Sequence, residues 1–242
     1  MVTNEPALLE IEGLNAAYGL AQILFDLSLS VRRGEVVALM GRNGAGKSST
    51  LKAVMGLLPA QARALRFAGH DIGGMASFRI ARLGLGYVPE ERRIFTDLTV
   101  AENLAVGAKP GVGGKARPAW TPERLYSIFP NLAQMQDRRA SQMSGGEQQM
   151  LTIARTLMGN PQAVLLDEPS EGLAPVIVQD MAAAVTRMKA EGIAVLVSEQ
   201  NLHFCSAVAD RAYVIEKGVI RHEGPMAAIV ADAGLREAYL GL

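Results

Sequence analysis

A phosphate-binding loop stands out at residues 41–48, which read Gly-Arg-Asn-Gly-Ala-Gly-Lys-Ser and match the Walker A spacing G-x-x-x-x-G-K-[ST]. Its glycines allow backbone N–H groups to turn inward around phosphates, Lys47 can reach the β- and γ-phosphates, and the Ser48 hydroxyl can ligate Mg²⁺. The residues expected to contact the nucleotide are Gly41, Arg42, Asn43, Gly44, Ala45, Gly46, Lys47, Ser48 and Ser49. The alternative is a glycine-rich turn that contains a lysine by chance.

The flanking sequence favours the phosphate-binding loop. Residues 36–40 form a continuous apolar run, typical of a parallel strand buried on both faces. Residues 49–55 can continue as a helix that ends at Gly56. A strand, a glycine loop and a helix, in this order, are the context that the motif requires.

Two adjacent carboxylates, Asp167 and Glu168, end a second apolar run at residues 163–166. Successive residues of a strand point to opposite faces, so the two are expected to have different roles. Asp167 is interpreted as the Walker B aspartate that holds Mg²⁺, and Glu168 as the general base that polarises the attacking water. Alone, this pattern also fits a solvated strand end; together with the loop at 41–48 it indicates nucleotide hydrolysis.

Charge and composition exclude several classes of function. The chain has 242 residues, 49% of them hydrophobic, and its 24 Lys and Arg balance its 24 Asp and Glu. Such a balance provides no global basic field for nucleic acid or an anionic membrane surface. We find no signal-peptide pattern at the N-terminus and no apolar run of ~20 residues. We therefore expect a cytoplasmic protein whose membrane contact comes through a protein partner.

A zinc site and an intrachain disulfide are not expected. Cys205 is the single cysteine, and its apolar surroundings indicate an inert core residue. His70, His203 and His222 lack the spacing of zinc ligands.

The N-terminal segment, residues 8–31, alternates apolar and polar residues and predicts a small antiparallel sheet. Tyr18 lies in it beside Gly19, where an aromatic ring could either stack on adenine or pack in the core. Residues 85–90 predict a short strand closed by Pro89.

Residues 92–158 are predicted to form a mainly helical insertion, interrupted by an exposed loop at 111–118. Ser144 and Glu147 have the spacing of a capping box, and a Ser-Gly-Gly turn that opens a helix is suited to bind an anion. A well-capped helix without a ligand is the alternative. A helix at 176–189, a strand at 193–197 and a hairpin at 213–220 follow. This order predicts an α/β fold with a mostly parallel sheet.

The order of these motifs resembles the ABC ATPases from about residue 8 to residue 224. The resemblance implies a P-loop NTPase of ABC ATPase type: a single domain over residues 1–242, with an N-terminal antiparallel β subdomain and the helical insertion at 92–158. It also implies a head-to-tail dimer in which ATP lies between the Walker A loop of one chain and the signature of the other. The signature residues are Ser144, Gly145, Gly146, Glu147 and Gln148. Tyr18 matches the family's adenine-stacking position.

Within the family, residues 87–95, 98–104, 167–175, 199–201 and 239–241 are similar to the LivF-type ATPases of branched-chain amino-acid uptake. Three positions depart from the general family pattern. Glu90 replaces the Q-loop Gln, which implies a carboxylate ligand for Mg²⁺, and Ala174 replaces the D-loop Asp. Gln200 replaces the catalytic switch His, although a slip of one residue would place Glu199 there.

The resemblance implies a subunit that hydrolyses ATP, with Mg²⁺, to import leucine, isoleucine or valine. Its implied partners are a second ABC ATPase subunit, two membrane permease subunits and an extracytoplasmic binding protein, with no nucleic acid. The chain would lie on the inner face of the cell membrane. Urea, amides or other amino acids are alternative cargoes. A non-transport ABC ATPase is disfavoured because the chain lacks coiled-coil arms and basic extensions.

Overall fold

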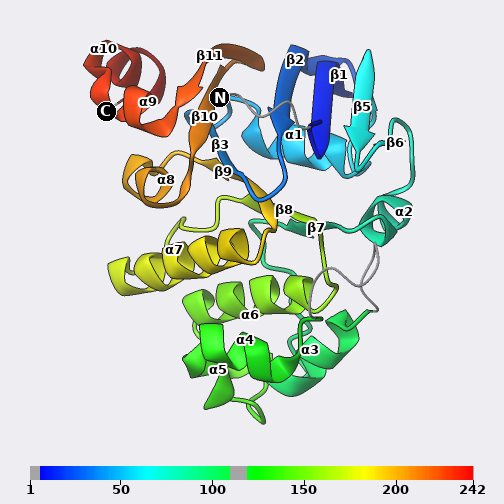
Figure 1. The fold of residues 1–242 in the computed structure, drawn as a ribbon, viewed down its shortest axis with the longest axis vertical. Coiled ribbons are helices and arrows are strands. Elements are labelled where there is room, and N and C mark those ends of the chain that lie inside the picture. Colours follow the sequence, from blue (N-terminus) through cyan, green and yellow to red (C-terminus); the bar gives the residue numbers. More distant parts are fainter. Residues whose placement is uncertain (1–5, 110–118, 242) are drawn as a thin grey trace.

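The computed structural model describes residues 6–109 and 119–241 and contains two β-sheets above a group of helices (Figure 1). The loop expected at 111–118 therefore lies outside the described residues. Among the helices that are described, none is long and apolar enough to cross a membrane.

The smaller sheet is antiparallel, with the order β2-β1-β5-β6 and with β4 also paired to β1. Its strands are β1 (Leu9–Tyr18), β2 (Ala21–Val31), β4 (Ala60–Gln61), β5 (Ala64–Phe67) and β6 (His70–Asp71). This confirms the antiparallel sheet predicted for residues 8–31. It also adds three short strands within residues 60–71, for which no strand was predicted.

The larger sheet has the order β11-β10-β3-β9-β8-β7, and every neighbouring pair is parallel except β10 with β11. Its strands are β3 (Val36–Met40), β7 (Leu85–Val88), β8 (Ala163–Asp167), β9 (Ala194–Glu199), β10 (Arg211–Glu216) and β11 (Val219–Pro225). All residues of β3, β8 and β9 are buried, as their apolar sequences predict. Because these strands are parallel, their carboxyl ends lie at one edge of the sheet.

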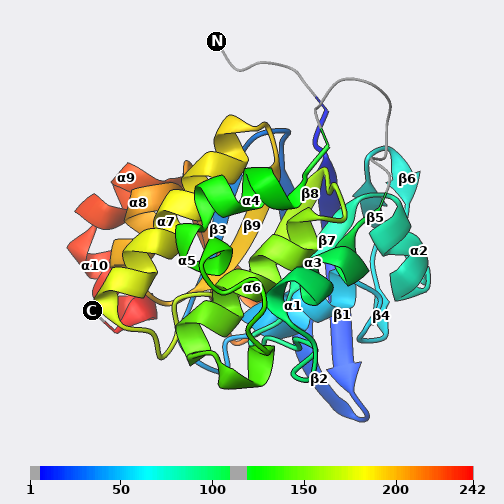
Figure 2. The same ribbon diagram turned by 90° about the horizontal axis from the view of Figure 1, so that it is seen from below.

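Helices cover both faces of the larger sheet (Figures 1 and 2). Their bounds are α1 (Lys47–Val54), α2 (Ser77–Arg82), α3 (Val100–Gly107), α4 (Pro122–Ile128), α5 (Pro130–Ala133), α6 (Gly145–Leu157), α7 (Pro175–Ala190), α8 (Leu202–Val208), α9 (Met226–Ala231) and α10 (Ala233–Leu235), with a 3₁₀ turn at Ala140–Gln142 and a π-helical turn at Arg236–Leu240. The helix after the glycine loop thus begins at Lys47.

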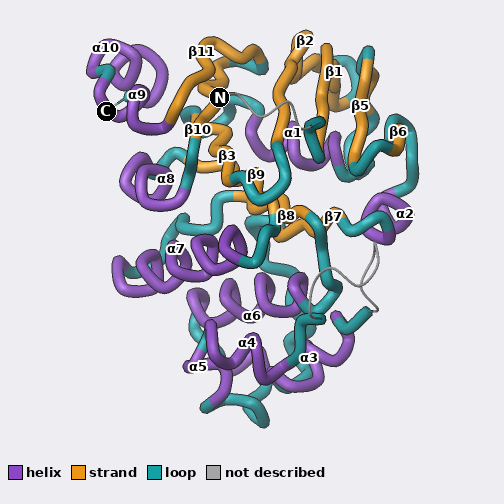
Figure 3. Tube along the Cα trace, viewed as in Figure 1, coloured by secondary structure: helices purple, strands orange, loops and turns teal. Residues whose placement is uncertain are grey.

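The tube in Figure 3 shows a loop between β7 and α3, so the helical prediction was wrong for residues 92–99. The single-domain organisation with an insertion at 92–158 stays a prediction.

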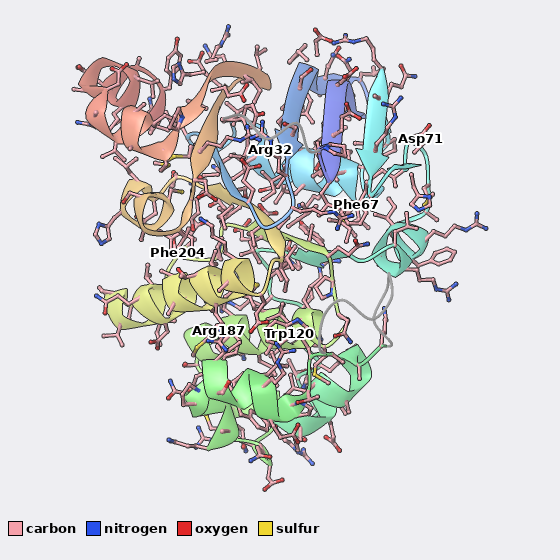
Figure 4. All side chains as sticks on the ribbon, viewed as in Figure 1. Arg32, Phe67, Asp71, Trp120, Arg187 and Phe204 are labelled. Atoms are coloured by element: carbon pink, nitrogen blue, oxygen red, sulfur yellow. The ribbon has the colours of Figure 1, made fainter. Side chains whose placement is uncertain are left out.

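Two hydrophobic cores lie on opposite faces of the larger sheet. Alternate residues of β3 point into each: Val36, Ala38 and Met40 pack with α6, α7 and α8, whereas Val37 and Leu39 pack with α1 and the smaller sheet. Figure 4 marks one buried aromatic residue in each of three regions: Phe67 on β5, Trp120 before α4 and Phe204 on α8. Helix α1 is thus held between the two sheets, which fixes the loop that precedes it.

An arginine joins the two sheets next to β3. The Arg211 guanidinium donates to Glu35 Oε1 at 2.7 Å, to the Tyr213 hydroxyl at 2.7 Å and to Glu223 Oε1 at 3.0 Å, and it also reaches the Ser30 carbonyl of β2. The side chains of Arg211 and Glu35 are only 13% and 12% exposed. Removing either charge would leave the other largely buried, with only a more exposed partner: Arg32 for Glu35 and Glu223 for Arg211.

We therefore expect Arg211→Met to lower the free energy of unfolding by about 3 kcal/mol, or the melting temperature by roughly 6–12 °C. Arg66→Met is the matched control, because Arg66 pairs with Glu10 at an exposed site and should contribute less than about 1 kcal/mol. Thermal unfolding followed by circular dichroism measures both. Equal shifts in the two variants would contradict the role of the Arg211 network.

Candidate functional site

The glycine loop is held tightly against β10. A Cβ atom at Gly41 would lie 2.4 Å from the Ile215 carbonyl oxygen, so no larger residue fits there. Gly46, with φ 112°, is the N-cap of α1, and no side chain caps the helix. The first N–H groups of α1 are therefore free of a side-chain acceptor and suited to an anion such as phosphate.

Lys47 is buried and points back over this loop. Its Nζ donates to the carbonyl oxygens of Gly41 at 2.9 Å and Arg42 at 3.2 Å. It also pairs with Glu168 Oε1 at 3.0 Å, and both side chains are less than 10% exposed. The two motifs that are more than a hundred residues apart in the sequence therefore meet through this ion pair.

Asp167 is the last residue of β8 and is held by its two neighbouring strands. Ser198 Oγ on β9 donates to Asp167 Oδ1 at 2.6 Å, and the Tyr87 hydroxyl on β7 donates to Oδ2 at 3.1 Å. Burial first, and then the charge of Asp167, raise the pKa of Tyr87, so this hydroxyl stays protonated. The Asp167 carboxylate is thus held in place, and each of its oxygens keeps a lone pair that can bind a further donor or a cation.

Glu168 is set apart from Asp167 by a turn. Strand alternation was the wrong reason to separate the two residues, because β8 ends at Asp167 and Glu168 has φ 45°, in the left-handed region. Its N–H donates to the Ser198 carbonyl at 3.0 Å, which holds the turn. Burial opposes ionisation of Glu168, but its hydrogen bond with Glu171 and its pairing with Lys47 prevail and lower its pKa. Glu168 is therefore an ionised carboxylate beside the loop.

A pocket of about 240 Å³ extends from Lys47 and Glu168 to Tyr18. Its described lining residues are Tyr18, Ile23, Gly44, Gly46, Lys47, Ser48, Ser49 and Glu168. The Tyr18 ring is 51% exposed, so it is a surface group rather than core packing. Of the other predicted loop residues, Gly41, Arg42, Asn43 and Ala45 do not line the described part of this pocket, and Ala45 is buried. The pocket combines an aromatic face, a helix N-terminus, a cation and a base.

The predicted signature caps α6, away from this pocket. Ser144 Oγ accepts from the Glu147 N–H at 3.4 Å, and Glu147 Oε2 accepts from the Ser144 N–H at 2.7 Å, which confirms the capping box. Gly146 packs closely, since a Cβ atom there would lie 2.8 Å from Ile177. Helices α6 and α1 lie on opposite sides of the larger sheet (Figure 1). Residues 144–148 do not line the described wall of the Lys47 pocket.

Glu90 lies in a second pocket, of about 250 Å³, on the other side of Glu168. Its described lining residues are Glu90, Arg92, Gln149, Glu168, Pro169, Glu171 and Leu173. Partial burial, and then the charges of Glu168 and Asp167, raise the pKa of Glu90. Ser48 lines the first pocket instead, so the predicted Mg²⁺ ligands Ser48, Glu90 and Asp167 are not gathered in one pocket. Within residues 6–109 and 119–241, no three His, Cys, Asp or Glu side chains form a metal-binding group.

Two oxygen ligands suited to Mg²⁺ are nevertheless available close to Glu168. The Ser48 hydroxyl lines the first pocket together with Glu168. Asp167, the last residue of β8 and the residue before Glu168, carries a carboxylate whose two oxygens each accept one hydrogen bond. Mg²⁺ prefers such ligands together with the phosphates of its nucleotide. These residues fit the ion as part of a nucleotide complex rather than as a site made by protein alone.

The end of β9 separates Glu199 from Gln200. Glu199 is 2% exposed, and its carboxylate accepts from the N–H groups of Ser170, Gln200 and Asn201. Burial raises its pKa. Gln200 is exposed and follows the strand at the edge where Gly41 follows β3. This placement favours Gln200 over Glu199 as the residue available to a nucleotide. Ala174 is the N-cap of α7 and provides no side-chain cap.

Three residues of the site were missed by sequence reasoning as functional groups: Ser198, Tyr87 and Glu171. Ser198 and Tyr87 hold Asp167 from neighbouring strands, and the strand order cannot be read from the sequence. Glu171 follows Glu168 by three residues, a spacing that suits a turn contact and could have indicated it. Cys205 is fully buried, as predicted, and burial raises the pKa of its thiol.

Comparison of the sequence with known proteins identifies a family and several relatives of this chain. The family model described as ABC transporter matches residues 24–171. BraG, the high-affinity branched-chain amino acid transport ATP-binding protein of Pseudomonas aeruginosa, is 41% identical over 234 residues, covering 97% of this chain and 100% of BraG. LptB, the lipopolysaccharide export system ATP-binding protein of Escherichia coli, is 32% identical over 237 residues, covering 97% of this chain and 98% of LptB.

Solved structures show the same fold. A nucleotide-free ATP-binding cassette from an ABC transporter has a TM-score of 0.81 and 28% sequence identity, covering 98% of this chain and 99% of the cassette. An ATP-binding cassette in its ADP conformation has a TM-score of 0.81 and 28% identity, covering 98% of this chain and all of that one.

Proposed function

The chain belongs to the ABC transporter family, and we propose that it is the ATP-hydrolysing subunit of an importer for branched-chain amino acids. Its membership makes it an ATPase coupled to transport. The observation that carries the proposal for this site is the pocket that joins the glycine loop, Tyr18 and Glu168. The similarity to BraG, a branched-chain amino acid transport ATP-binding protein, supports the cargo.

The residues of the site have separate roles in the proposed reaction. The Tyr18 ring stacks on the adenine, and Lys47 with the loop N–H groups binds the phosphates. Ser48 and Asp167 would hold Mg²⁺, which neutralises phosphate charge when bound. Glu168 orients the attacking water and accepts its proton, and Gln200 donates a hydrogen bond toward the γ-phosphate. Glu90 lies in the neighbouring pocket, so its part in holding Mg²⁺ stays a prediction.

The ion pair between Lys47 and Glu168 joins the phosphate-binding cation to the proposed base. Phosphates compete with Glu168 for the Lys47 ammonium, because each Nζ proton can serve only one strong acceptor at a time. Nucleotide binding then frees the Glu168 carboxylate to face water. Binding of the phosphates and availability of the base are thus coupled through one residue.

A second ATPase chain completes the site. Ser144–Gln148 form a helix N-terminus that lies away from the Lys47 pocket of the same chain. A head-to-tail dimer would bring that N-terminus of the partner chain over the γ-phosphate, where its positive end is favourable. ATP would close this interface and hydrolysis would open it.

The remaining partners are two membrane permeases and an extracytoplasmic binding protein, with this chain on the inner face of the cell membrane. Affinity purification from membranes in mild detergent should recover the permeases with the chain, and their binding protein should bind leucine, isoleucine or valine. Recovery of permeases whose binding protein prefers urea or an amide would overturn the cargo. LptB shows that a relative of similar length serves lipopolysaccharide export. Recovery with no membrane protein would overturn the transport role in this chain.

A groove beside β7 supplies the surface for a permease segment. It has a volume of about 360 Å³, and Phe95 and Val106, which are 48% and 54% exposed, are among its lining residues. Two neighbouring apolar residues do not belong to this surface: Leu104 is fully buried in the core, and Ile94 is partly buried against that core. Phe95 is the surface group, and buried Asn103 fixes its backbone by hydrogen bonds to both its N–H and its carbonyl.

Charge in the groove favours an acidic residue in the permease segment. Arg155 stacks on the Phe95 ring at 5.0 Å, and its Nη2 donates to the Arg93 carbonyl at 2.6 Å. Its buried Nη1 has no hydrogen-bond partner among the described residues. A carboxylate from the permease would satisfy this donor.

We expect Phe95→Asp to lower transport by a factor of about ten or more, because it removes a central apolar contact and repels an acidic segment. The ATP dissociation constant should change by less than about twofold, since the groove does not include the Lys47 pocket. Transport into proteoliposomes and nucleotide titration measure the two. Phe78→Asp, on exposed α2 and outside the groove lining, is the control. Unfolding of the Phe95 variant would instead indicate a core role.

A further inference from the structure

Arg92 lies beside the N-terminus of α6, the helix that the signature residues open, and has no role in the assignments above. A Cβ atom at Gly145, the first residue of α6, would lie 2.7 Å from Arg92 Nη1 and 3.1 Å from Arg92 Cζ. Because Gly145 has no side chain, it leaves the room that the guanidinium occupies. The loop after β7 thus places a cation against the turn that Ser144 caps.

The backbone of Arg92 is fastened to the same helix. Arg92 and Arg93 have φ 63° and 47°, in the left-handed region that residues other than glycine rarely adopt. Thr152 Oγ1 on α6 donates to the Arg92 carbonyl at 2.9 Å, and Arg155 Nη2 donates to the Arg93 carbonyl at 2.6 Å. Two side chains of α6 therefore hold this unfavourable turn, and Arg92 is anchored to the helix whose N-terminus it contacts.

The Arg92 guanidinium is not paired with the carboxylates close to it. It lines the pocket of about 250 Å³ together with Glu90, Glu168 and Glu171. Within residues 6–109 and 119–241, however, no side chain forms an ion pair or a hydrogen bond with this guanidinium. A guanidinium presents five N–H donors in a planar fork that fits a phosphate. The Arg92 donors are thus open to an anion that another molecule supplies.

A cation at this position is unfavourable by itself, because the N-terminus of a helix also carries partial positive charge. An anion that contacts both would remove this repulsion. In the head-to-tail dimer proposed above, the γ-phosphate of the ATP bound by the partner chain lies at this N-terminus. We propose that Arg92 is a further binding residue for that γ-phosphate. This role rests on the proposed dimer, and it adds a full positive charge to the N–H groups of α6.

The test compares Arg92→Gln and Arg92→Lys in the complex purified from membranes. Arg92→Gln removes the charge and should raise the dissociation constant for ATP by about tenfold. The dissociation constant for ADP should change by less than about twofold, because ADP has no γ-phosphate. Arg92→Lys should recover part of the lost affinity, because it keeps the charge without the planar fork.

Arg93→Gln is the matched control. The Arg93 side chain is 69% exposed and pairs with Glu91, so its removal should leave both dissociation constants within about twofold. Equal weakening of ATP and ADP in Arg92→Gln, or equal effects of Arg92→Gln and Arg93→Gln, would overturn the role of Arg92. Misfolding, which thermal unfolding detects, lowers the amount of both nucleotides bound, whereas the ratio of the two dissociation constants reports the contact to the γ-phosphate.

Lys47→Ala distinguishes the nucleotide of the partner chain from that of this chain. When this chain alone carries Lys47→Ala, the ATP that still binds tightly is held by the partner chain. Adding Arg92→Gln to the same chain should weaken that remaining ATP by about tenfold. If it causes no further loss, Arg92 does not act on the nucleotide of the partner chain.

The number of ATPase chains in the complex separates this inference from the proposed function. A molecular mass that allows only one ATPase chain would overturn the dimer, and the role of Arg92 with it. Two ATPase chains whose affinity for ATP is unchanged by Arg92→Gln would overturn the role of Arg92 alone.

Discussion

Glu168→Gln is expected to lower ATP turnover by a factor of about 10² or more while ATP still binds. The substitution removes the carboxylate that would accept a proton from water. It keeps the backbone turn, since the hydrogen bond from its N–H to the Ser198 carbonyl does not involve the side chain. The amide also competes less than a carboxylate for Lys47, so the dissociation constant for ATP should stay equal or fall.

Phosphate release and nucleotide titration of the purified complex measure these two quantities. Glu12→Gln is the matched control, because Glu12 is an exposed residue of β1 in the smaller sheet. Hydrolysis at the parent rate in Glu168→Gln would show that another group accepts the proton. A loss of ATP binding in the same variant would show that Glu168 serves the phosphates rather than the water.

Local sequence was sufficient for the main elements of this fold. The strand at 36–40 was predicted because its five residues are all apolar, and the hairpin at 213–220 because Glu216-Lys217-Gly218 separates two apolar runs. The capping box at Ser144 was predicted because its hydrogen bonds join residues three apart. In each case the physical cause lies within about ten residues of chain, where propensity and spacing are informative.

The arrangement around Asp167 and Glu168 needed the tertiary structure. The left-handed turn at Glu168 is stabilised by Ser198, which is thirty residues later in the chain. Asp167 and Glu168 were predicted to have separate roles because neighbouring residues of a strand point to opposite faces. The backbone does not support this reason, because the strand ends at Asp167. The short strands near Gly69 form only because β1 is available to pair with β4 and β5. Such pairings depend on strand order, which no local pattern specifies.

The second large effect is expected at Lys47, because three groups accept from its ammonium. Two loop carbonyls and the Glu168 carboxylate accept from its ammonium. Its side chain is 2% exposed, so none of these contacts is weakened by solvent. Phosphates entering the pocket replace the carboxylate as the acceptor.

Lys47→Ala is expected to raise the dissociation constant for ATP by a factor of about 10² or more, because a buried charge-assisted contact to phosphate is lost. Fluorescence titration with a labelled ATP analogue measures it. Lys52→Ala is the matched control, since Lys52 lies on the same helix and outside the described lining of the pocket. Similar affinities in the two variants would show that Lys47 does not bind the phosphates.

The same substitution also leaves Glu168 buried without its cation, so part of the lost affinity should come from repulsion between this carboxylate and the phosphates. Adding Glu168→Gln to Lys47→Ala removes that charge and should recover about tenfold in affinity. Recovery would show that Lys47 both attracts phosphate and neutralises the Glu168 carboxylate. If the double variant binds no better than Lys47→Ala alone, the phosphates do not approach Glu168 on binding, and the competition for Lys47 that links binding to catalysis is absent.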